Sequence, residues 1–186
     1  VLGNSQTTGL AHINGNWNIT NDLEVGGQSV GLNIYPALSA TMNLNSGGTV
    51  AVGGVLKLYS AGVINMNGGT LQLTSLQPES GIINFNAGTI KWTGSWNADY
   101  DQLQALLGTT PVLRQDQTVE VGGHTFLSST LTLNGGTFRT ETISNLNKLS
   151  IQSGLFELTN SSAGINTFQE NSFGPQLVLG SGSAVR

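Results

Sequence analysis

The sequence predicts an all-β fold, a single-chain parallel β-solenoid built from repeats (rungs) of about 20 residues. Three observations predict it. Segments with alternating apolar and polar residues recur at a nearly constant spacing, and each segment turns at a corner rich in Gly and Asn. Charged residues make up only 9% of the chain, against roughly 25% in an average globular domain.

Five segments share this pattern of strand, tight corner and second strand. Their corner residues are Thr49, Thr70, Thr89, Thr137 and Leu155. The corners are spaced by 21, 19, 48 and 18 residues, and the long interval fits two repeats plus an insertion. A weaker sixth copy lies at residues 12–19.

Each repeat places its apolar side chains on one side. Ile64 and Met66 alternate with Asn65 and Asn67, and a period of two directs one set inward and the other to solvent. One repeat cannot bury its apolar face alone, so several must stack, about 4.8 Å apart. The glycines supply the positive φ of a sharp corner; the corner glycines are Gly48, Gly69, Gly88 and Gly136.

Asparagine recurs just before the corner, at Asn45, Asn67, Asn86 and Asn134. Two interpretations remain open and are compatible. Asn favours turns because it tolerates the left-handed region and bonds to its own backbone. Stacked amides can also form a ladder from one strand to the next. Neither interpretation implies a ligand.

The sequence is expected to form one domain over residues 1–186, with four parts. Residues 1–40 lack a clean repeat and form a capping segment, since an open solenoid end needs protection, or degenerate rungs. Regular rungs follow at 41–93, an insertion at 94–112, and further rungs at 113–186. Residues 177–186 indicate an open C-terminal end, which favours head-to-tail stacking into filaments.

The insertion contains a short helix signal. Asn97 or Asp99 is placed to cap it, and Gly108 would close it. Its apolar face would consist of Leu103, Leu106 and Leu107.

Aromatic residues cluster in sequence around the insertion, at Trp92, Trp96 and Tyr100. With Asp99 and Asp101 beside them, they form a candidate ligand platform, because aromatic faces commonly hold sugar rings. The alternative is that the insertion packs against the solenoid and that Trp92, which continues a strand, is core.

Composition argues against several function classes. The net charge is −4 and the six basic residues are scattered, so nucleic-acid binding is not expected. There is no cysteine for disulfides or thiolate metal sites. No apolar run reaches the roughly 18 residues of a membrane span, and no cofactor motif is present.

Catalysis is the weakest of the functions considered. A polysaccharide-cleaving β-helix needs clustered carboxylates, and the ten acidic residues form only a few sequence pairs. Asp101, Glu120 and Glu141 have the spacing of neighbouring rungs, which arises easily by chance. His12 and His124 lack partners at metal-ligand spacing. We therefore expect no catalytic and no metal-binding residues.

The strings LNSGGTVAVGGVLKL, INMNGGTLQL, QTVEVGGHTFLSSTLTLNGGTFRT and SGLFELTN resemble the Gly-, Asn- and Thr-rich repeats of bacterial autotransporter-like passenger proteins, especially those with a PEP-CTERM sorting tail. The resemblance covers residues 41–159. It implies a right-handed solenoid in an exported or surface protein whose secretion signal and sorting segment are removed by processing or truncation. It also implies a link to the extracellular polysaccharide matrix.

These observations together predict a structural scaffold of the bacterial cell surface or extracellular matrix. Its expected partners are further copies of itself, stacked end to end into filaments, and extracellular polysaccharide. The alternative is a carbohydrate-binding adhesin module that uses the aromatic platform, and a polysaccharide-cleaving enzyme comes third.

Overall fold

The computed structural model describes residues 1–3, 7–30, 33–159 and 183–185. Strands hold 72% of the structure, against the roughly 20–25% of an average soluble domain. One short α-helix and a large, mainly parallel sheet accompany them, so the predicted all-β class is confirmed. The chain divides into two compact units, Val1–Ile90 and Lys91–Arg186, which are described separately.

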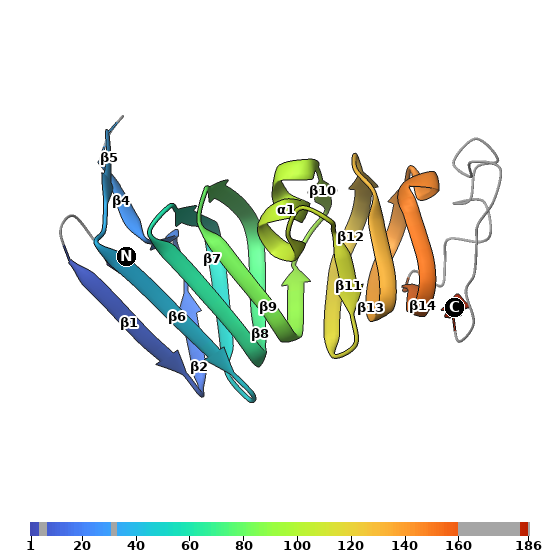
Figure 1. Ribbon diagram of the computed structural model, residues 1–186, viewed down its shortest axis with the longest axis horizontal. Helices are drawn as coiled ribbons and strands as arrows, with labels where there is room; N and C mark the ends of the chain where they lie inside the picture. Colours follow the sequence, from blue (N-terminus) through green and yellow to red (C-terminus); the bar gives the residue numbers. More distant parts are fainter. Residues whose placement is uncertain (4–6, 31–32, 160–182, 186) are drawn as a thin grey trace. The chain divides into compact units, whose positions relative to one another are not determined.

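The first unit consists of strands that pair in parallel, with one antiparallel hairpin. Its strands are β1 (Thr8–Ile13), β2 (Asn16–Ile19), β3 (Leu23–Val25), β4 (Gly27–Val30), β5 (Asn33–Pro36), β6 (Ser39–Asn45), β7 (Thr49–Tyr59), β8 (Gly62–Glu79) and β9 (Ile82–Trp92), whose last two residues belong to the second unit. Figure 1 shows β1, β6, β8 and β9 side by side, in the order in which they are bonded. β2 and β3 pair with β7, and β7 pairs with β8.

The strand register follows the sequence repeat. Thr49 pairs with Thr70, as their shared corner position predicts. The weak copy at residues 12–19 is also confirmed, because His12 pairs with Asn43 and Asn16 pairs with Thr49. Repeats that align in sequence therefore lie on neighbouring strands.

The apolar positions of each strand form the interior. β6 alternates strictly, with Met42 and Leu44 buried between less buried polar residues. Ile64 and Met66 on β8 are the register partners of this pair and are also fully buried. The period-two alternation thus produces files of stacked apolar side chains.

The N-terminal 40 residues contribute paired strands as well as a hairpin. β1, β2 and β3 pair in parallel with β6 and β7 in the manner of the regular repeats. β4 and β5 form a separate antiparallel pair. Residues 8–25 thus contribute three strands to the parallel sheet.

The second unit has the same parallel pairing. It contains β10 (Trp96–Ala98), α1 (Tyr100–Leu107), β11 (Val112–Arg114), β12 (Gln117–Leu127), β13 (Leu131–Ser144), a 3-10 turn (Leu146–Lys148), β14 (Leu149–Leu158) and β15 (Ser183–Val185). β12, β13, β14 and β15 are neighbours in that order, β10 pairs with β12, and β11 pairs with β13. Thr137 pairs with Leu155, as their corner positions predict. Of the predicted C-terminal rung and open end, all but β15 lie outside the described residues.

An additional repeat fills the long interval between corners. Thr118 on β12 pairs with Thr137, and Leu113 on β11 pairs with Leu133. Asp116, with a φ of 66°, stands two residues before Thr118, where Gly135 stands before Thr137. An aspartate therefore replaces the corner glycine, so the spacing predicted a further repeat in this interval but not the position of its corner.

The predicted helix is present as α1. Of the two expected caps, Asp99 serves, because its carboxylate accepts a hydrogen bond from the Gln102 backbone N–H at 2.9 Å. Leu103 and Leu106 are buried, and Gly108 follows the helix with a φ of 80°.

Candidate functional site

The corner glycines serve two different purposes. Positive φ falls on the first glycine of a pair, as at Gly47 and Gly68, whereas the predicted Gly48, Gly69 and Gly136 lie one residue later. A side chain there would collide with a neighbouring strand: a Cβ at Gly69 would lie 2.6 Å from the Asn45 carbonyl oxygen, and one at Gly136 2.7 Å from that of Arg114. Among the predicted corner glycines, only Gly88 combines close approach with positive φ.

The predicted asparagines bond to side chains on neighbouring strands. Asn86 Nδ2 donates to Asn67 Oδ1 at 2.9 Å, and Asn45 Nδ2 donates to Asn14 Oδ1 at 2.9 Å. Asn134 accepts from the Ser153 hydroxyl at 3.1 Å. In the described part of the chain, none of the four has a positive φ, so these contacts correspond to the ladder interpretation.

A second asparagine ladder lies two residues earlier in the same strands. Asn65 Nδ2 donates to Asn43 Oδ1 at 2.7 Å, and Asn84 Nδ2 donates to Asn65 Oδ1 at 2.8 Å. His12 Nδ1 lies 3.3 Å from Asn43 Nδ2 and extends the file. The sequence signal was available, because Asn occupies both of the polar positions that alternate with apolar residues before the corners at Thr49, Thr70 and Thr89.

The aromatic platform predicted at Trp92, Trp96 and Tyr100 does not present three ring faces. Trp92 and Trp96 stack on each other with ring centroids 4.5 Å apart, and each is only 2% exposed. Trp96 Nε1 donates to Gln102 Oε1 at 2.6 Å, which fastens α1 to this pair. Only Tyr100 is accessible, at 50% exposure. Because their faces are covered, the tryptophans cannot stack on a sugar ring.

Two of the acidic residues that the sequence analysis named, Glu120 and Asp99, have structural partners. Glu120 accepts from Lys91 Nζ at 2.7 Å, and Asp99 caps α1. His124 Nδ1 lies 2.7 Å from the Thr142 hydroxyl. Over the described ranges, no three His, Cys, Asp or Glu side chains are grouped so as to hold a metal ion.

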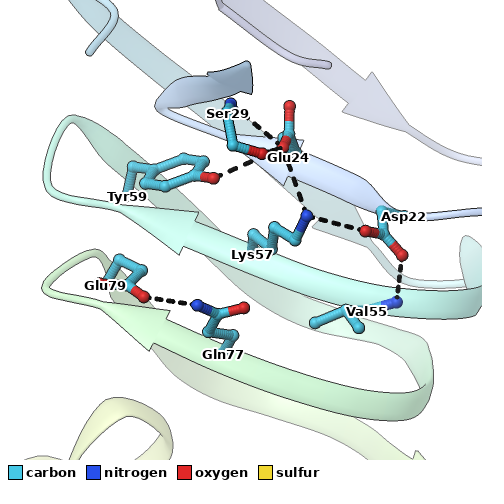
Figure 2. A network of polar contacts seen from close by, with 8 residues as sticks. All are labelled: Asp22, Glu24, Ser29, Val55, Lys57, Tyr59, Gln77 and Glu79. Carbon is cyan, nitrogen blue, oxygen red and sulfur yellow. Dashed lines mark hydrogen bonds and ion pairs between the residues drawn. The ribbon is translucent and has the colours of Figure 1, made fainter. Parts of the chain in front are cut away.

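A polar cluster around Glu24 is the largest feature that the sequence did not predict (Figure 2). The buried Glu24 carboxylate accepts from the Ser29 N–H at 3.2 Å, from the Ser29 hydroxyl, and from the Tyr59 hydroxyl at 3.4 Å. Lys57 Nζ lies 3.6 Å from Glu24 Oε1 and 2.8 Å from Asp22 Oδ2. The members come from β3, β4 and the residue before β3, which lie in the stretch without a clean repeat, and from β7, which belongs to the regular repeats.

The ion pair in this cluster shifts both of its groups. The hydrogen bond from Lys57 lowers the pKa of Asp22, helped by the Val55 N–H, which donates at 2.9 Å. The hydrogen bond to Asp22 raises the pKa of Lys57, against the opposing effect of burial. The ion pair therefore stabilises the pairing of β3 with β7, and each of its two charged groups has an oppositely charged partner.

A file of alternating charge runs through the second unit. Lys91 pairs with Glu120, Glu120 is the register neighbour of Arg139, and Arg139 Nε donates to Glu157 Oε2 at 2.8 Å. Each charge thus has an opposite charge on an adjacent strand.

Comparison of the chain with protein-family models, with curated proteins and with solved structures gives no match. Within the described residues, no helix is long and apolar enough to cross a membrane.

Proposed function

We propose that this protein is a structural scaffold, a right-handed β-solenoid of the bacterial cell surface or extracellular matrix that assembles end to end. The observation that carries the proposal is the stacking of equivalent residues in files, such as Asn43, Asn65 and Asn84. Polar groups in these files bond to one another rather than converging on a pocket. Contacts of this kind, in which each repeat bonds to its neighbours, support a structural repeat rather than an active site.

The first strands offer an edge for assembly. β1 pairs only with β6, and β2 only with β7, among the described strands. A strand that pairs on one side presents unpaired backbone groups that can recruit another chain. Trp17 on β2 is 42% exposed and lies at this edge, where a second copy would cover it.

Light scattering and electron microscopy across a concentration series test the assembly. We expect filaments from the parent chain and a persistent monomer from Trp17→Lys, because a charge at the edge opposes strand addition. Phe126→Lys is the matched control, since Phe126 is similarly exposed, at 43%, but lies on β12, which pairs on both sides.

Two outcomes would contradict the proposal. One is a parent chain that stays monomeric at the highest concentration. The other is loss of filaments in Phe126→Lys as complete as in Trp17→Lys, which would show that any added charge has this effect.

A further inference from the structure

An ordered surface covers β1, β6, β8 and β9 in the first unit, and we call it the amide face. It consists of three files of outward side chains, one residue from each strand or its end: Leu10, Thr41, Val63 and Ile82; His12, Asn43, Asn65 and Asn84; and Asn14, Asn45, Asn67 and Asn86. The register places the members of each file next to one another.

The ladder bonds hold the amides of this face in place but use only part of their hydrogen-bonding capacity. A ladder bond occupies one N–H of the donor and one lone pair of the acceptor, whereas an Asn side chain has two of each. Asn65, which both donates and accepts in the ladder, therefore keeps one N–H and one lone pair. All four Asn–Asn bonds run in the same direction, from the later strand to the earlier one.

The file that begins with Leu10 adds an apolar strip beside the amides. Leu10 is 62% exposed and Ile82 is 53% exposed, at opposite ends of the file. Thr41 and Val63 lie between them and contribute methyl groups. Exposed apolar side chains beside ordered hydrogen-bonding groups are the usual lining of a ligand site.

The chemistry of the ligand follows from what the face contains. None of its 12 residues is Asp, Glu, Lys or Arg, so a charged ligand would find no counter-charge. Its groups repeat from strand to strand at about 4.8 Å, which suits a repeating chain. We propose that the amide face binds a neutral polysaccharide, whose ring faces lie on the Leu10–Ile82 file and whose hydroxyls bond to the amides.

Preorganisation strengthens this site. The ladder bonds already fix the Asn rotamers, so binding loses little side-chain entropy. The site shares β1 with the edge proposed for assembly, but it consists of side chains on the face of the sheet and not of the unpaired backbone groups of the edge. It can therefore be tested on the Trp17→Lys monomer.

Affinity electrophoresis through gels that contain hydroxyethyl cellulose, dextran or polygalacturonate tests the proposal. We expect at least one neutral polymer to retard the protein and the anionic polygalacturonate to have no effect. Asn14→Asp should weaken the retardation about fivefold, the equivalent of one lost hydrogen bond. Asp at this position still accepts from Asn45 Nδ2, so the ladder survives while the face gains a charge and loses donors.

Two matched controls separate the face from general surface effects. Asn16→Asp adds the same charge to an exposed position on β2, outside the amide face, and should leave binding unchanged. Leu10→Ser combined with Ile82→Ser should weaken binding roughly tenfold through lost apolar contact. Leu38→Ser, at an exposed residue outside the face, should have no effect.

Three results would overturn the assignment. They are the absence of retardation by both neutral polymers, equal weakening by Asn14→Asp and Asn16→Asp, and retardation by polygalacturonate alone. Inhibition of ice recrystallisation without polysaccharide binding would also overturn it and assign the ordered array to water instead.

Discussion

At each corner of the repeat, adjacent residues meet different steric demands. The first glycine takes a positive φ, as Gly135 does at 93°, while the second, Gly136, admits a neighbouring backbone too close for any Cβ. Asp116 shows that the first demand can be met without glycine, since Asp is among the few residues that tolerate the left-handed region. The second demand is absolute wherever the Cβ would meet backbone.

This difference predicts the effect of substitutions at equivalent corners. Asp116→Gly should stabilise the second unit by about 0.5 kcal/mol, because it relieves left-handed strain at some cost in chain entropy. Gly135→Ala should destabilise it by about 1 kcal/mol for the converse reason. Urea unfolding followed by Trp92 and Trp96 fluorescence measures both. A loss of stability in Asp116→Gly would mean that the aspartate side chain itself holds the corner.

The Asp22–Lys57 pair predicts a defined pH dependence. The pKa of Asp22 is lowered by folding, so its contribution is present above the unfolded value of about 3.9 and is lost as pH falls below it. The pKa of Lys57 is raised, so its contribution is present below about 10.4 and is lost as pH rises through the folded value. Between these limits the pair contributes at a constant level.

Asp22→Asn removes the negative charge and keeps the neighbouring hydrogen bond, because Asn can still accept from the Val55 N–H. We expect the variant to be less stable by about 0.5 kcal/mol near neutral pH, as is usual for an exposed pair. The difference should begin to shrink as pH falls below about 4 and should vanish once pH is below the lowered pKa of Asp22 in the folded protein. Urea unfolding of the first unit, followed by Trp17 fluorescence at several pH values, measures it. A difference that persists in acid would attribute the effect to the amide rather than to the lost charge.

At the scale of the strands, the ladders convert sequence periodicity into cross-strand bonds. Asn65→Ala removes two of these bonds, one to Asn43 and one to Asn84. Because the site is partly exposed and water can replace the lost partners, we expect a cost of about 1 kcal/mol. Gln72→Ala on the same strand is the control, since Gln72 makes no side-chain hydrogen bond in the described part of the chain. Equal costs for the two variants would show that the ladder adds nothing to stability.

The regular strands could be predicted from the sequence because their register repeats a short pattern. Thr49 and Thr70, and Thr137 and Leu155, pair as their corner positions indicate. A further repeat was expected in the long interval and is present at β11 and β12, but its corner was not located because Asp116 stands in place of glycine. The Glu24 cluster could not be predicted, because side chains 35 residues apart in sequence, such as Glu24 and Tyr59, come into contact without a shared sequence motif.

The fate of the aromatic residues shows why a candidate site is harder to predict than a strand. Trp92 follows Ile90 by two residues, and both are buried, so alternation already placed it inside. No alternation predicted the burial of Trp96, which depends on its stacking with Trp92 and on its hydrogen bond to Gln102 of α1. Proximity in sequence brought the rings together but did not determine which faces remain accessible.

Across each unit, every parallel pair whose register is defined joins residues 18 to 33 positions apart. The loop-closure entropy of such pairs is lost before their contacts form, so parallel sheets of this kind fold slowly. Mispairing of strands is one hazard during folding. In the second unit the charges alternate along the file of Lys91, Glu120, Arg139 and Glu157, so a strand that paired with the next strand but one would bring like charges together.

We therefore expect refolding from urea on a timescale of milliseconds to seconds or slower. Stopped-flow fluorescence can follow each unit through its own tryptophans, Trp17 in the first and the stacked Trp92–Trp96 pair in the second. Glu157→Lys places a cation opposite Arg139 and removes the penalty against a slipped register. It should slow recovery of the native signal of the second unit. Glu157→Gln, which removes the native attraction without adding a repulsion from Arg139, should slow it less. Refolding of the parent chain within microseconds would mean that local contacts, rather than these distant pairings, control the folding barrier.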